Sequence, residues 1–190
     1  IKYQDTNGDG QITDADKRRL GKSGKPRGQF GINLNMSYKG FYLSALFQGS
    51  TKFNMYVAGS LGMQTGQTYG MPVAYDYQTD FWTPDNRDAQ YPRLMANTAL
   101  NQNNNYASSD FWLINGAYLR MKDFQFGYDF KYSLLKNVSW LTRCKMGISG
   151  QNIFTISQAT KYGMDPEPSD TNYYGYPVER TIALTLNLGF

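Results

Sequence analysis

Apolar and polar residues alternate one by one along several stretches of this chain, and this period of two constrains the fold more than any other feature. The first such stretch has polar or small residues at odd positions and apolar residues at Phe30, Ile32, Leu34, Met36 and Tyr38. Successive side chains of a β-strand point to opposite faces of the sheet. The pattern therefore predicts a strand with one apolar face and one polar face.

The same alternation predicts five strands in all. Their expected ranges are about 29–38, 41–50, 117–130, 142–152 and 178–190. Each is about ten residues long or longer, whereas strands of soluble proteins most often have about 5 to 6 residues. A tilted strand that crosses a bilayer needs about 9 to 11 residues. The strand lengths therefore favour a membrane protein.

The first two strands are separated only by Lys39-Gly40. A two-residue hairpin sets Tyr38 opposite Phe41 on the same face, as the two apolar stripes require. Lysine is not a favoured residue at the first position of a primed turn, so the alternative is a bulged type I turn that uses Gly40.

Along the third strand the apolar stripe changes parity. Phe124 and Phe126 fall on even positions, whereas Leu119 and Met121 fall on odd ones. A β-bulge inserts one residue and changes which face the following residues occupy. The change of parity predicts a bulge, or an exit from the bilayer, near Lys122.

The segments between the strands differ greatly in length. Residues 51–116 and 153–177 show no sustained period, are rich in polar residues and glycine, and are expected to form long irregular loops. If neighbouring strands are antiparallel, both loops and residues 1–27 lie at one end of the sheet, and the connections at 39–40 and 131–141 lie at the other. Long loops at one end and short turns at the other are typical of outer-membrane barrels.

These observations predict an all-β fold in which residues 28–190 form the C-terminal strands, about five of them, of a large antiparallel transmembrane β-barrel with long extracellular loops. Barrels made of one chain have at least about 8 strands. We therefore expect a fragment whose other strands lie upstream of Ile1, with Phe190 as the C-terminus. The alternative is a half-buried sheet of a soluble β-sandwich. The end of the chain resembles the signal that outer-membrane assembly machinery reads, carried by Leu184, Leu186, Leu188 and Phe190.

Composition excludes several classes of function. The chain has no histidine, so the usual general base and the commonest transition-metal ligand are missing. Its single cysteine, Cys144, has no partner for a disulfide or a zinc site. The net charge is +4, but the basic residues are scattered, which argues against nucleic-acid binding. We expect no catalytic residues and no enzymatic activity.

The stretch DTNGDGQITDAD, residues 5–16, matches the twelve-residue calcium loop of EF-hands. Oxygen ligands are spaced by two residues, and Gly10 stands at the sharp turn. The final ligand is an aspartate where the pattern has a bidentate glutamate, so weaker calcium binding is expected. The expected ligands are Asp5, Asn7, Asp9, the backbone carbonyl of Gln11, and Asp16.

A metal-free alternative for this loop is a cluster of Asn-Gly and Asp-Gly turns. Under the calcium hypothesis, Ile12 packs beneath the loop and residues 14–20 form a short helix. The loop lies on the extracellular side, where calcium is plentiful. A weak site there stays filled and acts as a structural clip.

Two features of the long loops have competing interpretations. Aromatic residues of the first loop either stack on sugar rings or pack the loop against a partner protein, and packing is favoured. The acidic pair Asp165 and Glu167, separated by one proline, is interpreted as turn chemistry rather than as a catalytic pair. The aromatic residues in question are Tyr69, Tyr75, Tyr77, Phe81, Trp82 and Tyr91.

Seven ordered blocks resemble the C-terminal part of the SusC/RagA-like TonB-dependent outer-membrane transporters of the Bacteroidetes. They cover nearly the whole chain: DTNGDGQITDADKRRLG, YKGFYLSALFQGS, FWTPDNRDAQYPRL, NGAYLRMKDFQFGYDF, SGQNIFT, YGMDPE and YPVERTIALTLNLGF.

The resemblance implies part of a nutrient importer in the outer membrane of a Gram-negative bacterium, surrounded by outer-membrane lipid. It also implies a SusD-like lipoprotein as a lid, a plug domain outside this chain that couples to the TonB complex, and an oligosaccharide or peptide as substrate. The alternative function is that of a soluble, calcium-stabilised β-sandwich that binds carbohydrate. No residue is assigned to substrate.

Overall fold

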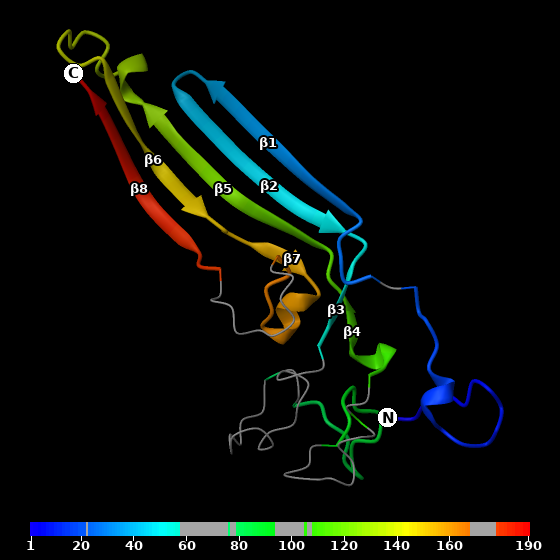
Figure 1. The fold of residues 1–190 in the computed structure, drawn as a ribbon. Coiled ribbons are helices and arrows are strands. Elements are labelled where there is room, and N and C mark those ends of the chain that lie inside the picture. Colours follow the sequence, from blue (N-terminus) through cyan, green and yellow to red (C-terminus); the bar gives the residue numbers. More distant parts are fainter. Residues whose placement is uncertain (22, 58–75, 77–78, 94–104, 106–107, 168–177) are drawn as a thin grey trace.

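In the computed structural model, the chain forms one long antiparallel sheet and a small two-stranded sheet (Figure 1). The structure describes residues 1–21, 23–57, 76, 79–93, 105, 108–167 and 178–190. The large sheet has the strand order β1-β2-β5-β6-β8, and every neighbouring pair is antiparallel. Its long strands are β1 (Gly28–Tyr38), β2 (Phe41–Thr51), β5 (Tyr118–Asp129), β6 (Arg143–Gln151) and β8 (Thr181–Gly189).

These five strands correspond to the five that the alternating pattern predicts. The largest difference is at the last strand, which begins at Thr181 rather than at 178. Residues 178–180 belong to no strand, and Arg180 there interrupts the apolar stripe. The all-β, antiparallel architecture predicted from the sequence is confirmed.

The prediction that residues 51–116 and 153–177 are wholly irregular is wrong. The first range contains β3 (Asn54–Tyr56), a 3₁₀ turn η3 (Asp110–Trp112) and β4 (Leu113–Asn115). The second contains β7 (Thr155–Ser157) and the turn η5 (Ala159–Tyr162). Strands of three residues are too short to produce a visible period in the sequence.

A register shift in the middle of the sheet keeps its apolar face continuous. Leu46 pairs with Asp123, but the next residue, Phe47, pairs with Met121, which leaves Lys122 as an extra residue in β5. The bulge predicted near Lys122 is therefore confirmed. Because of it, Met121 lies beside Phe47, so the odd positions before the bulge share the face of the even positions after it.

The β1–β2 connection is a two-residue turn in which Lys39 has φ 46° and Gly40 has φ 88°. Tyr38 pairs with Phe41, as predicted. Positive φ at both central residues is the requirement of a type I′ turn, so the bulged type I alternative is wrong. The twist of the two strands selects the primed turn although lysine disfavours a left-handed conformation.

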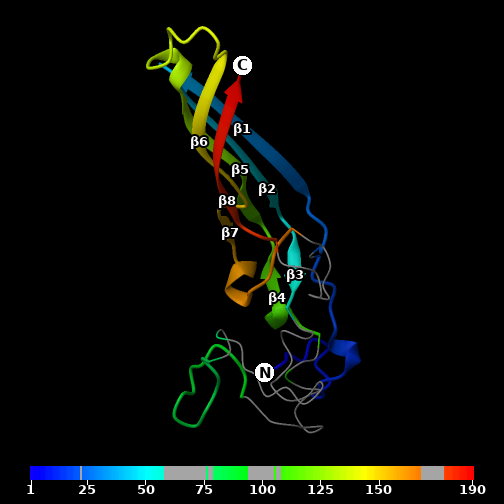
Figure 2. The same cartoon turned by 90° about the vertical axis from the view of Figure 1, so that its left-hand side faces the viewer.

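The short turns and the C-terminus lie at one end of the elongated sheet, and the small sheet and the N-terminus lie at the other (Figures 1 and 2). We call these the turn end and the loop end. The main cluster of buried apolar residues is at the loop end and not between the long strands. It contains Phe53, Met55, Val57, Tyr91, Trp112, Ile114, Tyr118, Ala159, Tyr162 and Met164.

Among the described residues, no helix is both long and apolar enough to cross a membrane.

On the polar face of the sheet, the ring of Tyr42 lies over two glycines that pair across β5 and β6. Gly127 is the register partner of both Tyr42 and Gly147. A Cβ atom at Gly147 would lie 2.8 Å from the Tyr42 hydroxyl oxygen. A Cβ atom at Gly127 would overlap both that hydroxyl and the backbone carbonyl oxygen of Met146. The glycines therefore leave the space that the tyrosine ring fills.

We expect Gly127→Ala to destabilise the full-length protein by about 1 to 3 kcal/mol, the usual range for forcing an extra methyl group into a packed site. The overlap with the Met146 carbonyl cannot be relieved by a side-chain rotation. The matched control is Gly31→Ala, because a Cβ atom there would be 3.8 Å from its nearest neighbour, the Phe47 carbonyl oxygen. Unfolding midpoints in detergent check this. Equal midpoints for the two variants would contradict it.

Candidate functional site

One face of the long sheet is apolar across all five strands, and most of it has no protein cover among the described residues. Near the loop end, Ile153 lies over Gly150 and the Phe154 ring lies 6.4 Å from the Phe47 ring. Cross-strand pairs on this face include Met36 with Leu43, Leu43 with Phe126, and Ile148 with Leu184. The last strand is the most exposed: Leu184 retains 78% of its accessible surface. Soluble monomers rarely expose an apolar surface of this extent.

The dimensions of this face suit a bilayer. β1 and β2 each have 11 residues, which corresponds to about 36 Å at roughly 3.3 Å per residue. At a tilt of about 45° such a strand rises about 26 Å, close to the roughly 25 Å apolar band of membrane barrels. Each inner strand has hydrogen-bonded neighbours on both sides, so its backbone polar groups are satisfied without water.

The opposite face is polar and suited to water. Asn35 donates a hydrogen bond to Asn33 at 3.0 Å and accepts one from Ser44 at 2.8 Å. Lys145 lies 5.4 Å from the centre of the Tyr42 ring, an attractive cation–π geometry. A sheet with one apolar and one hydrated face can separate lipid from an aqueous interior.

A buried charge cluster joins β5 to the segment after η5. The side chain of Arg120 is 3% exposed and forms ion pairs with Asp165, at 2.7 Å, and with Glu167. The ammonium group of Lys122, the bulge residue, lies 2.9 Å from Glu167. Arg120 also donates to the Thr155 hydroxyl at 2.8 Å. Two cations and two carboxylates thus compensate one another around the buried guanidinium of Arg120, and the other three side chains are half-buried.

The interpretation of Asp165 and Glu167 as turn chemistry is confirmed in part, but it is incomplete. Asp165 does accept the backbone N–H of Glu167 at 2.9 Å, which is turn chemistry. Its larger contribution is to neutralise Arg120, because a buried arginine without a partner costs several kcal/mol (about 3 to 5). In the sequence, the available signal was an arginine on a strand flanked by apolar residues, which requires a carboxylate partner.

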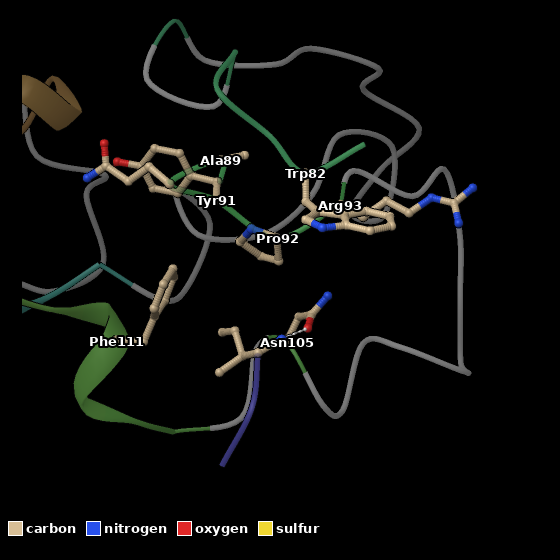
Figure 3. A pocket seen from close by; sticks show the side chains of 9 residues that line it. Trp82, Ala89, Tyr91, Pro92, Arg93, Asn105 and Phe111 are labelled. Carbon is tan, nitrogen blue, oxygen red and sulfur yellow. Dashed lines mark hydrogen bonds between the residues drawn. The ribbon is translucent and has the colours of Figure 1, made fainter. Parts of the chain in front are cut away.

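At the loop end, the N-terminal Ile1, residues between 82 and 93, Asn105 and Phe111 line a pocket of about 530 Å³ (Figure 3). Trp82, Tyr91 and Pro92 lie on one side, and Asn105 and Phe111 lie on the other. Trp82, Tyr91 and Phe111 are the aromatic residues of this lining.

The structure separates the roles of the loop aromatic residues that it describes. Tyr91 is buried in the loop-end core, where its hydroxyl lies 3.4 Å from that of Tyr162. Burial, and secondarily the neighbouring Tyr162, raises the pKa of the Tyr91 hydroxyl. Phe81 forms an isolated bridge with Tyr91, and Trp82 faces the pocket. Tyr69, Tyr75 and Tyr77 lie outside the described residues.

The predicted calcium loop is ordered by its own side chains. Both carboxylate oxygens of Asp5 accept backbone N–H groups, from Gly8 at 2.6 Å and from Gly10 at 2.8 Å. Asn7 accepts from the Asp9 N–H at 2.9 Å and donates to the Asp9 carboxylate at 3.0 Å. The side chains of Asp5, Asn7 and Asp9 thus hold the loop in successive Asx turns, at the positions that the calcium pattern assigns to ligands.

Asp16 closes the loop from its C-terminal end. Its carboxylate accepts the backbone N–H groups of Thr6 and Thr13, each at 2.8 Å, and these bonds lower its pKa. It also completes a capping box with Thr13 at the short 3₁₀ turn η1 (Asp14–Asp16). Within the described part of the chain, no three His, Cys, Asp or Glu side chains are grouped to hold a metal ion.

Two local expectations about this segment are wrong. The helix expected over 14–20 is only η1, and Ile12 is 54% exposed rather than packed beneath the loop. The capping box marks the start of the turn, and the turn ends at Lys17, whose backbone is extended with φ −65° and ψ 128°. The backbone N–H of Gln11 donates to the Asp9 carboxylate at 2.8 Å. The backbone carbonyl oxygen of Gln11 is the atom that the calcium pattern assigns as a ligand.

Comparisons with known proteins agree with the sequence blocks. No protein-family model matches the chain. TonB-dependent receptor P3 of Formosa agariphila is 28% identical over 203 residues, which cover 99% of this chain and 19% of that protein. TonB-dependent receptor P26 of the same organism is 28% identical over 202 residues and is covered to the same extent. The chain thus spans about a fifth of the length of these relatives.

Solved structures show the same fold. A structure of the RagAB peptide transporter aligns with a TM-score of 0.68, and one of the RagAB peptide importer in the closed-closed state aligns with 0.66. Both alignments cover 95% of this chain and 19% of the other, at 21% identity. The resemblance to a C-terminal part of SusC/RagA-like proteins is therefore confirmed, and so is the assignment to antiparallel barrel strands.

The charge cluster generates a prediction about the loop that it fastens. Asp165→Asn leaves Arg120 with one carboxylate fewer in a buried site, at a cost of about 1 to 3 kcal/mol. The segment should then open more often, and trypsin should cut after the exposed Lys161 about ten times faster. The matched control is Asp14→Asn, which removes a solvent-exposed ion pair with Lys17. Equal cleavage rates at Lys161 in both variants would refute a fastening role for the cluster.

Proposed function

We propose that this chain forms part of the wall of an outer-membrane barrel in a TonB-dependent nutrient importer. The observation that carries the proposal is the apolar face that runs unbroken over five hydrogen-bonded strands and is exposed in the described structure. Exposure of such an apolar face to water is unfavourable, whereas contact with lipid tails is not. The similarity to proteins named TonB-dependent receptors and to the RagAB importer supports transport as the activity.

The substrate class follows less directly. RagAB is a peptide importer, and the resemblance to SusC-like proteins adds oligosaccharides, so the proposed cargo is a peptide or a glycan fragment. The polar face of amides, hydroxyls and glycines suits the passage of such hydrated solutes. Energy coupling is assigned to a plug domain and TonB, for which this chain has no described residues. The chain itself is proposed to have no enzymatic activity.

A SusD-like surface lipoprotein is the proposed partner at the loop end. The loop-end core of Trp112, Tyr91 and Tyr162 holds several loop segments together as one packed unit. The charge cluster around Arg120 fastens the same unit to the barrel wall. A packed and fastened rim supplies a fixed seat for a lid protein, whereas free loops would lose entropy on docking.

We also propose that the loop of residues 5–16 binds calcium as a structural clip. The oxygen-bearing side chains of Asp5, Asn7 and Asp9 at the ligand positions and the carbonyl of Gln11 support this, since hard cations prefer oxygen ligands. The Asp16 carboxylate already accepts three backbone N–H groups, those of Thr6, Asn7 and Thr13, so Asp16 acts from the rim of the site or through a water molecule. The proposed affinity is correspondingly low, in the range of extracellular sites.

The soluble β-sandwich is the less favoured alternative. A sandwich requires a second sheet packed against the apolar face. Over the described residues, most of that face is uncovered, and its exposed members include Ile182, Leu184 and Leu186.

The membrane hypothesis predicts opposite outcomes for neighbouring residues of β8. Leu184→Arg places a charge on the proposed lipid face and should destabilise the full-length protein by about 2 to 4 kcal/mol near the bilayer midplane. Thr185→Arg, on the aqueous face, should cost far less. Unfolding titrations in lipid vesicles measure both. A cost for Thr185→Arg as large as that for Leu184→Arg would contradict the assignment of the two faces.

The calcium hypothesis predicts that Asp9→Asn weakens calcium binding at least about tenfold, because affinity depends on the number of charged ligands. Metal content after dialysis against graded calcium concentrations measures this in the full-length protein. Asp14→Asn serves as the control, since Asp14 pairs with Lys17 and lies outside the ligand positions. Calcium content that is equal in Asp9→Asn and in the unmodified protein would exclude this loop as the site.

A further inference from the structure

The turn end carries exposed apolar residues where a water-facing turn would have polar ones. In the connection between β5 and β6, Leu134 is 78% exposed and Trp140 is 66% exposed. Tyr132, in the 3₁₀ turn η4 (Phe130–Tyr132), is exposed as well. The β1–β2 turn lies against this connection: a Cβ atom at Gly40 would be 3.0 Å from the Cβ of Tyr132.

The same two turns are basic. Residues 130–142 contain Lys131 and Lys136 and no Asp or Glu, and the adjacent turn contributes Lys39. Lys131 is occupied, because its ammonium group donates to the Val138 carbonyl at 2.5 Å. Lys39 and Lys136 are exposed, and neither forms a salt bridge to a described residue. We call Lys39, Lys136, Tyr132, Leu134 and Trp140 the turn-end surface.

The turn-end surface continues directly into the apolar face of the sheet. Trp140 stacks on Phe190 with ring centres 5.8 Å apart and planes inclined by 5°. Phe190 follows β8 in step with Leu186 and Leu188 and is 78% exposed. On the β1 side, Lys39 lies 5.1 Å from the ring centre of Tyr38, the last residue of the β1 stripe. The cations therefore begin where the apolar face ends.

We infer that the turn-end surface binds the headgroups of anionic phospholipids in the leaflet at this end of the barrel. The inference rests on the proposed function, because it requires that the apolar face lie in a bilayer. Tyrosine and tryptophan favour the headgroup level of a membrane, where the ring is apolar and the polar atom is hydrated. Lysine beside a membrane attracts anionic headgroups. The two turns place both residue types at one level.

A lipid fits this surface better than a protein partner does. The exposed apolar residues are continuous with the lipid-facing side rather than with the polar face, so a protein bound to them would have to enter the bilayer. Lys39 and Lys136 form no salt bridge to a described residue, and the phosphate diester of an anionic lipid would provide the negatively charged partner. A periplasmic protein as the occupant is the competing outcome of the test.

The test uses the full-length protein in two kinds of lipid nanodisc, phosphatidylcholine alone and phosphatidylcholine with phosphatidylglycerol. The measured quantity is the enrichment of phosphatidylglycerol among the lipids that remain bound in native mass spectrometry. We expect the double variant Lys39→Gln and Lys136→Gln to lower that enrichment about tenfold, since each cation near a membrane surface attracts anionic lipid. The matched control, Lys2→Gln with Lys161→Gln, removes two exposed cations at the loop end and should leave it unchanged.

The unmodified protein provides a second readout that needs no variant. Its enrichment should fall steeply between low and high salt, because the attraction is electrostatic. The inference is overturned if the protein enters both bilayers but shows no enrichment, or if the double variant retains the full enrichment. It is also overturned if the loop-end control loses as much. Failure to enter either bilayer would instead refute the proposed membrane function.

Discussion

The two-residue period of the strands, held in register across five of them, is the constraint on which the rest of the structure depends. A shift of one residue in any pairing would move an apolar stripe to the polar face. The register instead sets Leu43 between Met36 and Phe126, and Ile148 between Phe126 and Leu184. One face is apolar and the other polar because every pairing preserves parity.

The bulge at Lys122 shows how strictly parity is maintained. The sequence of β5 changes phase there, and without the extra residue Met121 and Leu119 would face the aqueous side. The pairing of β6 with β5 ends next to the bulge, at Asp123. Beyond the bulge, β7 pairs with Tyr118–Arg120 of β5 instead. The displaced Lys122 is used a second time, as a partner of Glu167. The bulge that keeps the apolar face continuous thus also supplies a positive charge to the cluster around Arg120, which fastens the segment after η5.

The main buried core lies at the loop end, and Tyr118 at the start of β5 is its member from the five long strands. Most side chains between the long strands and the proposed lipid have no protein layer over them, whereas Trp112, Tyr118 and Tyr162 pack together at the loop end. The ion pairs of Arg120 lie between these two regions. The rim is consequently stabilised as in a soluble protein, by burial and compensated charge, and the sheet by backbone hydrogen bonds and, under the proposed function, by lipid.

Much of the wall was determined by the sequence alone, because alternation is a local property that survives in any sheet. The five strands, the pairing of Tyr38 with Phe41 and the bulge at Lys122 all follow from counting positions. The spacing of Asp5, Asn7 and Asp9 predicted a calcium loop, and in the structure these side chains hold the loop together by hydrogen bonds. Calcium binding itself stays a prediction.

Only the tertiary structure decided what depends on contacts between distant segments. Arg120 meets Asp165 and Glu167 across more than 40 residues, and no periodicity records such a meeting. The short strands β3 and β4 are stabilised by pairing with each other. They are far apart in the sequence, so local propensity does not predict this pairing. Even at the β1–β2 turn, strand twist outweighed the preference of Lys39. Local pattern fixes which face a residue occupies, but the enclosing fold decides which charges are buried together, because the cost of burial is set by the surroundings and not by the neighbouring residues in the chain.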